Sequence, residues 1–425
     1  MRLKLEHTEE RLTRRSGLVL IDRFGKKIRL GEQVDTLFPA PGSNRGFAAS
    51  TFVSALMEMM IDGGMHLDDI RLFEEDRAYK EMTGRTQYPT SDAIGDWLRR
   101  HGEAGAEVIG EISDELVRKM TFENDLVLDI DTTIIVSEKG DAERSYKGMR
   151  GYNPLLGACP KIGLFLTPRF QQGNISPQTD LVSYLIACQK ALPNRITTIR
   201  IDSAGYNHFV INHCMENHLL FTITGDHDSA VMEKINTLPA ASWKQGFKED
   251  GIAAKYQIAE TIHTMNQTRE AFRLVIKRTE RRSQLDLFED YSYWIIATNI
   301  PQTKMDAQKI IDHHEDRGRM EKMIGELKTH LHLDHLPCGQ FSANSLYFSV
   351  GVLAYNTVVL LKRQYFGIAW QRKTIESLRY YLLNVPAHLV KHSRYLIARM
   401  ALRYDLFEIL NDVYNRIIAR PLAPV

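Results

Sequence analysis

Three acidic residues stand where carboxylates could do chemistry. Asp131 lies in the apolar run DLVLDIDTTIIV, Asp202 closes the run TTIRID, and Glu321 lies in the run HHEDRGRMEKMIGELKTHL. An acid inside an apolar strand is costly to bury unless it is paired or bound to a metal ion. Carboxylate oxygens are hard ligands that suit Mg²⁺ or Mn²⁺. These positions therefore predict a divalent-metal site.

Each acid also has a structural interpretation. Asp129 precedes Asp131 by two residues and shares its face of the strand, so either could bind metal or form an internal salt bridge. An Asp before a Ser-Ala-Gly turn, as at Asp202, is more often a turn former or helix cap. Carboxyl ends of strands in α/β sheets are nevertheless where ligands usually bind.

The third acid is interpreted from a helical projection at about 100° per residue. The projection places Arg317, Glu321 and Lys328 within roughly 60° of His314, beside an apolar stripe. Glu326 points roughly 120° away and is the weaker candidate. Without the other two acids, this polar arc would be interpreted as a solvated salt-bridge ladder.

The elements that must position these acids read as a mixed α/β layer. Strands are expected over residues 125–136, 161–170, 196–202 and 219–225, and helices over 180–192 and 206–217. Residues 226–300 carry β-branched and aromatic runs that predict an all-β insertion. One helix is expected from about 305 to 331, followed by a largely helical C-terminal region. Near the N-terminus, GLVLIDRFGKKIRL alternates enough to suggest a hairpin, and Thr90 or Ser91 can cap a helix.

Bulk composition describes an ordinary globular protein. The 425 residues include 54 basic and 53 acidic side chains, for a formal net charge of +1, so DNA binding would need local clusters. The four cysteines lack CxxC spacing, and the N-terminus has no apolar signal region. No stretch approaches a membrane span of about 18 apolar residues. We therefore expect a cytoplasmic protein with reduced thiols and no membrane partner.

Together these residues carry a family resemblance. The run His314-x2-Arg317-x3-Glu321-x6-Lys328 resembles the Tyr-x2-Arg-x3-Glu-x6-Lys signature of a group of DDE transposases from bacterial insertion sequences, with His in place of Tyr. Asp131-Thr132-Thr133 resembles the segment of the family's first aspartate, and RIDSAGYN resembles that of the second. The resemblance covers about residues 125 to 395.

The resemblance implies an α/β ribonuclease H-like mixed-sheet core with a β-rich insertion, flanked by helical N- and C-terminal regions. It implies a transposase that cuts the ends of a mobile DNA element and transfers strands into target DNA. Two Mg²⁺ or Mn²⁺ ions would be held by Asp131, Asp202 and Glu321, with Asp131 bridging both. The partners implied are terminal inverted repeats, target DNA and a second copy in the synaptic complex.

Several residues are candidates for DNA contact. Arg317 and Lys328 flank Glu321 and would neutralise phosphates, and in relatives the position of His314 contacts phosphate. The insertion adds the basic run Lys277, Arg278, Arg281 and Arg282. Trp243 could stack on an unpaired base, as an insertion Trp does in some relatives, although packing is the more frequent role of such a residue. Irregular spacing argues against zinc at His330, His332, His335 and Cys338.

The expected organisation has five parts. These are a mainly helical DNA-binding region (1–120), the first part of the core (121–225), the β-rich insertion (226–300), a catalytic helix completing the core (301–335) and a helical C-terminal region (336–425). Two alternatives remain open: a ribonuclease H-like nuclease without strand transfer, and a DNA-binding regulator with an inactive site.

Overall fold

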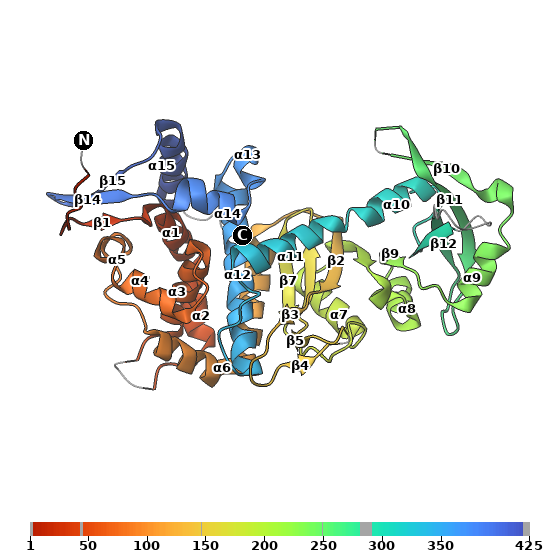
Figure 1. Ribbon diagram of the computed structural model, residues 1–425, viewed down its shortest axis with the longest axis horizontal. Coiled ribbons are helices and arrows are strands. Elements are labelled where there is room, and N and C mark those ends of the chain that lie inside the picture. Colours follow the sequence, from red (N-terminus) through yellow and green to blue (C-terminus); the bar gives the residue numbers. More distant parts are fainter. Residues whose placement is uncertain (1–2, 43–45, 146, 249, 281–290, 420–425) are drawn as a thin grey trace.

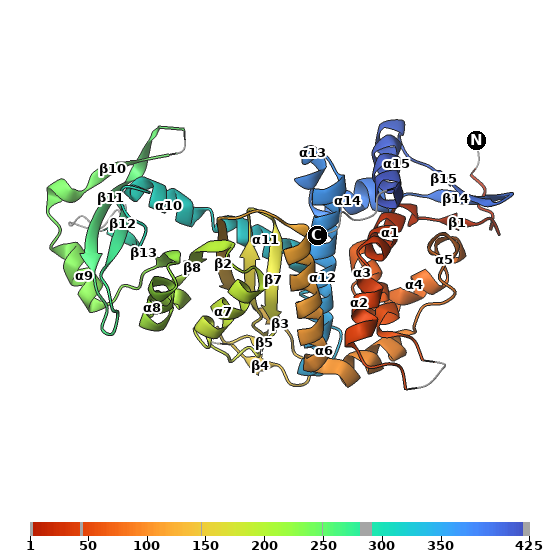
Figure 2. The ribbon, with the colours of Figure 1, turned by 180° about the vertical axis from the view of Figure 1, so that it is seen from behind.

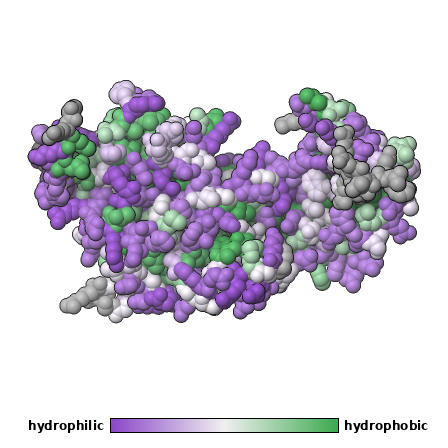
Figure 3. Space-filling model, viewed as in Figure 1, coloured by the Kyte–Doolittle hydropathy of each residue, from purple (hydrophilic) through white to green (hydrophobic). Residues whose placement is uncertain are grey.

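The computed structural model describes residues 3–42, 46–145, 147–248, 250–280 and 291–419. The molecule is elongated (Figure 1), with the N- and C-terminal elements in one lobe, a central sheet, and the insertion in a second lobe at the other end. Figure 3 shows a saddle in the upper outline between the two lobes. The candidate acids belong to elements that lie between these lobes.

The central strands are rich in Leu, Ile and Val and are buried on both faces. Five of them lie in the order β7-β6-β2-β8-β9. β2 runs parallel to β8, and β8 parallel to β9, whereas β6 is antiparallel to both β2 and β7. Their bounds are β2 Leu126–Thr132, β6 Leu155–Cys159, β7 Leu164–Arg169, β8 Ile196–Ile201 and β9 Leu220–Thr224.

Two helices connect these strands: α7 (Leu181–Ala191) and α8 (His208–Glu216). They carry the chain from β7 to β8 and from β8 to β9, and the latter crossover joins parallel neighbours. Figure 2 shows α7 over the rear of the sheet, while α11 crosses the front in Figure 1. The predicted strands and helices are confirmed here, except that β6 was not predicted. A small side sheet contains β3 Ile135–Val136, β4 Glu143–Arg144 and β5 Arg150–Tyr152.

The insertion contains the expected antiparallel strands together with one helix. The helix α9 (Ser229–Asn236) corrects the expectation of an all-β segment. Asp228 caps it by accepting the N–H of Val231, which favours helix over strand at this point. β13 pairs with β9, so the insertion continues the central sheet to nine strands. Its strands are β10 Lys244–Phe247, β11 Ala253–His263, β12 Phe272–Glu280 and β13 Tyr291–Thr298.

The expected single helix over residues 305–331 is two helices. α10 (Ala307–Glu315) ends before Asp316, and α11 (Gly318–His330) begins after Arg317. Asp306 caps α10 through the N–H of Lys309. Because the helix is interrupted at 316–317, one projection does not describe both halves, and a residue on α10 cannot be assigned to the same face as one on α11.

The N-terminal lobe is helical from Ser16 onward, and the hairpin expected over residues 17–30 is wrong. Leu18, Ile21, Phe24 and Ile28 are all buried, at the three- and four-residue spacing of a helix. The predicted cap is confirmed at Thr90, which accepts the N–H of Ala93. The bounds are β1 Leu12–Thr13, α1 Val19–Lys27, α2 Leu30–Leu37, α3 Ala49–Asp62, α4 Arg71–Glu74, α5 Arg77–Thr83 and α6 Ser91–Met120.

The C-terminal region was expected to be helical, but a β-hairpin follows its first helices. The hairpin strands β14 and β15 join β1 in a three-stranded sheet, so the two ends of the chain are structurally linked. The elements are α12 Phe341–Tyr365, α13 Ile368–Gln371, α14 Ile375–Leu378, a π-helix Arg379–Leu383, β14 Ala387–His392, β15 Tyr395–Met400 and α15 Tyr404–Ala419.

The helix α12 has an apolar stretch long enough to span a membrane, contrary to the expectation from the sequence that no stretch approaches that length. Among the described helices it alone has the length and apolar composition of a membrane span. Its apolar stretch is entirely buried inside the protein, against α6 and α3. α12 is therefore the central core helix of this lobe.

Candidate functional site

Asp131 and Asp202 are brought together by strand register. In the parallel pair β2 and β8, Ile130 is opposite Ile201, so the two aspartates are the next residues at adjacent carboxyl ends. Burial is the main cause that raises the pKa of Asp131 above its usual value, and the nearby charge of Asp202 raises it further. Two carboxylates that repel one another at a strand end are a suitable site for a cation.

Asp129 is engaged elsewhere. It is buried, and its two oxygens accept hydrogen bonds from Arg200 Nε at 2.6 Å and Nη2 at 2.7 Å. Arg200 is also buried and donates to the carbonyl of His313. This pair holds β2, β8 and α10 together, which leaves Asp129 as a structural partner and Asp131 as the accessible acid of the strand.

The backbone after β8 shapes the surroundings of Asp202. Its Oδ1 accepts the N–H of Ala204 at 3.0 Å and so starts the turn Ser203–Gly205. A cavity of about 310 Å³ lies beside it, lined by Asp202–Ala204 and residues 173–178. The turn-forming role considered from the sequence is therefore present, and the residue also faces an accessible hollow.

Glu321 is linked to Asp131 through Arg317. Arg317 Nη1 donates to Asp131 Oδ2 at 3.0 Å, and its Nη2 lies 3.7 Å from Glu321 Oε1. The Glu321 side chain is 64% exposed, in the first turn of α11. Across the described ranges, no three acidic, His or Cys side chains are grouped closely enough to share one metal ion. The structure thus places Asp131 beside Asp202, whereas Arg317 lies between Asp131 and Glu321.

The donor chemistry of these residues fits a divalent cation. Asp131, Asp202 and Glu321 offer only carboxylate oxygens, the ligands that Mg²⁺ and Mn²⁺ prefer. Arg317 neutralises part of their charge, so the acids do not require an ion to remain together. A cation bound here would compete with Arg317 for Asp131.

Lys328 fixes the same helix to the end of β2. Its ammonium group donates to the carbonyl of Ile134 at 3.0 Å and approaches Thr133 Oγ1 at 3.4 Å. Lys328 and Arg317 therefore hold α11 to the strand that carries Asp131 at two points, about three helical turns apart.

His314 is buried in the core, whereas the expected polar arc would place it beside exposed Glu321. Its Nε2 lies 2.9 Å from Thr224 Oγ1 and its Nδ1 lies 3.0 Å from Thr222 Oγ1, and its ring packs near Trp294. Burial lowers its pKa to about 3. The expected phosphate contact has no exposed ring nitrogen to make it, because both ring nitrogens face threonine hydroxyls of β9.

The basic and aromatic candidates of the insertion are partly engaged with one another. The Arg278 guanidinium lies 4.0 Å from the Trp243 ring centre and 4.3 Å from that of Tyr291, and it also donates to Gln257. Lys277 forms an ion pair with Glu315 at 2.6 Å. Arg281 and Arg282 lie outside the described residues. Trp243 therefore packs on Arg278 within the insertion.

Asp226, which the sequence analysis did not select, follows the third parallel strand. Burial raises its pKa, and the charges of Asp228 and Asp202 raise it further. Like Asp202, it comes just beyond a strand end, in the run TITGD, and this signal could have identified it. It adds negative charge beside the pair formed by Asp131 and Asp202.

The alternatives considered on α11 have structural partners. Glu326 Oε2 accepts the N–H of Ile375 at 3.1 Å and so holds the start of α14. His330 lies 3.3 Å from Glu376, while His335 pairs with Asp334. None of the described His or Cys side chains in this segment belongs to a metal-binding group of three.

Comparison with known proteins gives two matches of different kinds. A family model described as "Transposase DDE domain group 1" matches residues 1–421. No curated protein matches the chain. A solved piggyBac transposase synaptic complex with hairpin DNA is 9% identical, with a TM-score of 0.49 over 96% of this chain and 82% of the other.

Proposed function

The chain belongs to the DDE transposase family, since the family model spans residues 1–421, and we propose that Asp131, Asp202 and Glu321 hold the metal ions for its reaction. Members of this family bind DNA, cut it with the help of divalent metal ions and transfer strands. The observation that carries the assignment is the register of β2 and β8, which supports Asp131 and Asp202 as a pair. The link from Arg317 to both Asp131 and Glu321 supports Glu321 as the third member.

We propose Mg²⁺ or Mn²⁺ as the cofactor, with two ions. Bound between carboxylates and a phosphate, such ions activate an oxygen nucleophile and stabilise the leaving oxygen. On this proposal, Asp131 and Asp202 orient the ions from the sheet, and Glu321 contributes from α11. The Arg317 guanidinium moves from Asp131 to a DNA phosphate, with which its planar group can form two parallel hydrogen bonds. Lys328 keeps the helix docked while this happens.

The strand order supports a ribonuclease H-like core. Three successive antiparallel strands (β2, β6, β7) are followed by β8 and β9, which add in parallel on the other side of β2. We propose that the insertion and the terminal lobe grip DNA on either side of this core, and that two copies join in the synaptic complex. The five-part division at 120, 225, 300 and 335 remains a proposal, as does a cytoplasmic location.

Cleavage of DNA carrying the element's ends, with Mg²⁺ or Mn²⁺, tests the site. Intact protein is expected to nick the ends and join the freed 3′-hydroxyl to target DNA, whereas Glu321→Gln is expected to do neither. Nicking without joining would favour the nuclease alternative. Binding without nicking by the intact protein would favour the regulator.

A further inference from the structure

A cluster of two exposed tyrosines and the half-buried Trp370 lies beside the helix that carries Glu321. Tyr380 is 75% exposed, Tyr381 is 44% exposed, and Ile368 nearby is also exposed. The rings of Trp370 and Tyr381 are 6.4 Å apart, and those of Tyr380 and Tyr381 are 5.0 Å apart and perpendicular. We call Trp370, Tyr380 and Tyr381 the aromatic edge. Isolated exposed aromatics are ordinary, but a contiguous set indicates an interaction surface.

The local backbone explains why two successive tyrosines face solvent. They lie in the π-helix Arg379–Leu383, whose last two residues, Leu382 and Leu383, are buried. The wide π turn directs both leucines inward and both tyrosines outward. π turns are rare in proteins, but a large share of those that occur lie at functional sites.

This segment is fastened to the second half of α11. Glu326 accepts the N–H of Ile375, and His330 approaches Glu376 at 3.3 Å. Arg379 donates to the carbonyl of His330 and, at 2.6 Å, to that of Ile61. His330 is nine residues beyond Glu321, which is about 14 Å along a helix. That span is about four nucleotides at the spacing of a stacked duplex strand.

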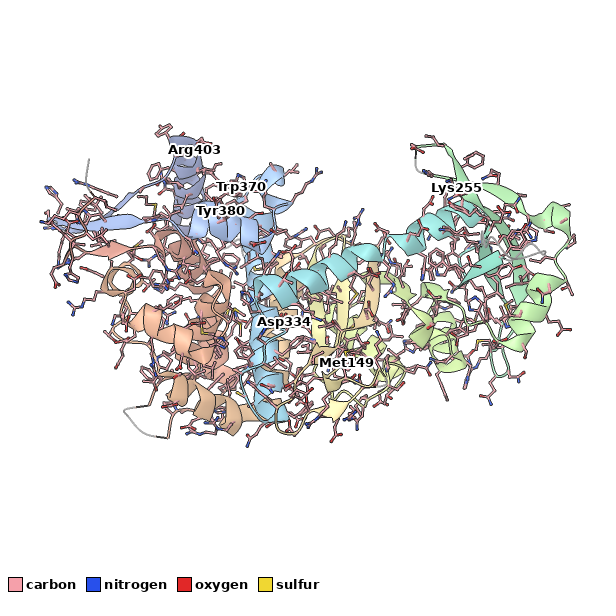
Figure 4. The ribbon with its side chains drawn as sticks, in the orientation of Figure 1. Met149, Lys255, Asp334, Trp370, Tyr380 and Arg403 are labelled. Carbon is pink, nitrogen blue, oxygen red and sulfur yellow. The ribbon has the colours of Figure 1, made fainter. Side chains whose placement is uncertain are left out.

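The charge around the aromatic edge suits a polyanion. Arg372 and Lys373 are exposed and lie between Trp370 and the tyrosines in the sequence, and Arg403 lies near Tyr381. Among the acids of this region, Glu376 pairs with His330 and Asp405 pairs with Arg403. Figure 4 shows Trp370, Tyr380 and Arg403 together on the upper part of the terminal lobe, with Lys255 across the saddle.

We propose that the aromatic edge stacks unpaired bases of a DNA end, within about four nucleotides of the phosphate that is cut. Exposed aromatic rings interleaved with basic side chains bind single-stranded nucleic acid, because every base offers a flat face and every nucleotide a phosphate. Offset cleavage of the two strands of a duplex leaves such unpaired nucleotides. This inference rests on the proposed function, since it takes the DNA end to lie at Glu321.

The test compares two DNA probes with the full-length chain, without metal so that nothing is cut. One is a blunt duplex, and the other is the same duplex with a four-thymidine overhang. The intact protein is expected to bind the overhang more tightly. The double variant Tyr380→Ala/Tyr381→Ala is expected to lose about tenfold on the overhang and to bind the blunt duplex unchanged. The double Phe variant should retain the preference, since its rings remain.

Tyr395→Ala is the matched control, because Tyr395 is 74% exposed but lies on β15, away from α11. Equal overhang binding by the double Ala variant and the intact protein would overturn the proposal. So would unchanged DNA binding with loss of a dimer in sedimentation, which would assign the aromatic edge to a second copy. If the intact protein bound neither probe, the proposed function itself would fail.

Discussion

The guanidinium of Arg317 lies 3.0 Å from Asp131 and 3.7 Å from Glu321, so one arginine connects the strand acid with the helix acid. Arg317 thus supplies one positive charge that the two carboxylates share. Phosphate and metal ions together can replace it, since phosphate attracts the arginine while the ions take the acids.

Arg317→Gln should therefore separate cleavage from metal binding. We expect DNA cleavage to fall by roughly a hundredfold, the loss typical when one charged donor to a reacting phosphate is removed. Mn²⁺ binding without DNA, followed by electron paramagnetic resonance, should be as tight or tighter, because the competing guanidinium is gone. Arg319→Gln is the control, since Arg319 is exposed and pairs with Asp316. Weaker Mn²⁺ binding in Arg317→Gln would contradict this view.

Glu321→Gln and Glu326→Gln form a matched pair on the same helix. The first should abolish metal-dependent cleavage, because an amide oxygen cannot replace the negative charge. The second should retain it, because a glutamine oxygen can still accept the N–H of Ile375. Cleavage assays on the two variants decide the matter, and an active Glu321→Gln beside an inactive Glu326→Gln would reverse the assignment.

Asp129→Asn and Asp131→Asn should differ in stability although they are two residues apart. Removing the charge of Asp129 leaves buried Arg200 with only the more distant carboxylate of Asp316, which should cost about 3–5 kcal/mol of unfolding free energy. Removing the charge of Asp131 should cost less, because it relieves repulsion from Asp202 and leaves Arg317 beside Glu321. Urea unfolding of both variants measures the difference. Equal losses would show that Asp129 is not the structural acid.

His314 should make stability fall in acid. Its pKa is lowered by burial to about 3, so between that value and the unfolded value of about 6.5 the unfolded chain binds more protons. The contribution is complete above about pH 6.5 and is lost as the pH falls toward about 3. At pH 5 this costs about 2 kcal/mol relative to pH 7.

His314→Gln should remove that part of the pH dependence. Unfolding free energies at pH 7 and pH 5 are compared with those of His335→Gln, in which an exposed imidazole is replaced. The His314 variant should lose about 2 kcal/mol less between the two values than either the intact protein or the control. An identical pH response in all three proteins would mean that the buried ring titrates normally.

The sequence predicted the structure correctly where the pattern of a single segment fitted only one kind of element. The Leu- and Ile-rich run around Asp131 and the short run ending at Asp202 both fold as predicted, because alternation and burial specify a central strand. It was less informative where a pattern spans two elements. The spacing from His314 to Glu321 suggests one face, but packing of α10 against β9 and Trp294 places His314 in the core.

Two further errors have tertiary causes. GLVLIDRFGKKIRL alternates locally, yet its apolar residues also satisfy a helical period, and packing against the rest of the lobe selects the helix. AHLVKHSRYLIARM was expected to be helical, but its strands pair with each other and with β1, a partner at the opposite end of the chain. The local sequence of this segment does not indicate a strand partner so far away in the chain. Arg317 likewise could pair with several carboxylates near it in the sequence, and only the fold brings Asp131 to it.

That pairing of distant segments has a consequence for the timing of folding. Ser16 donates to the carbonyl of Val385, 369 residues later, and Lys27 reaches the carbonyl of Ile417. The terminal lobe therefore cannot close until synthesis has passed Ile417, even though the strands bearing Asp131 and Asp202 are made much earlier. A polypeptide released before that point would carry those acids without the closed lobe beside them.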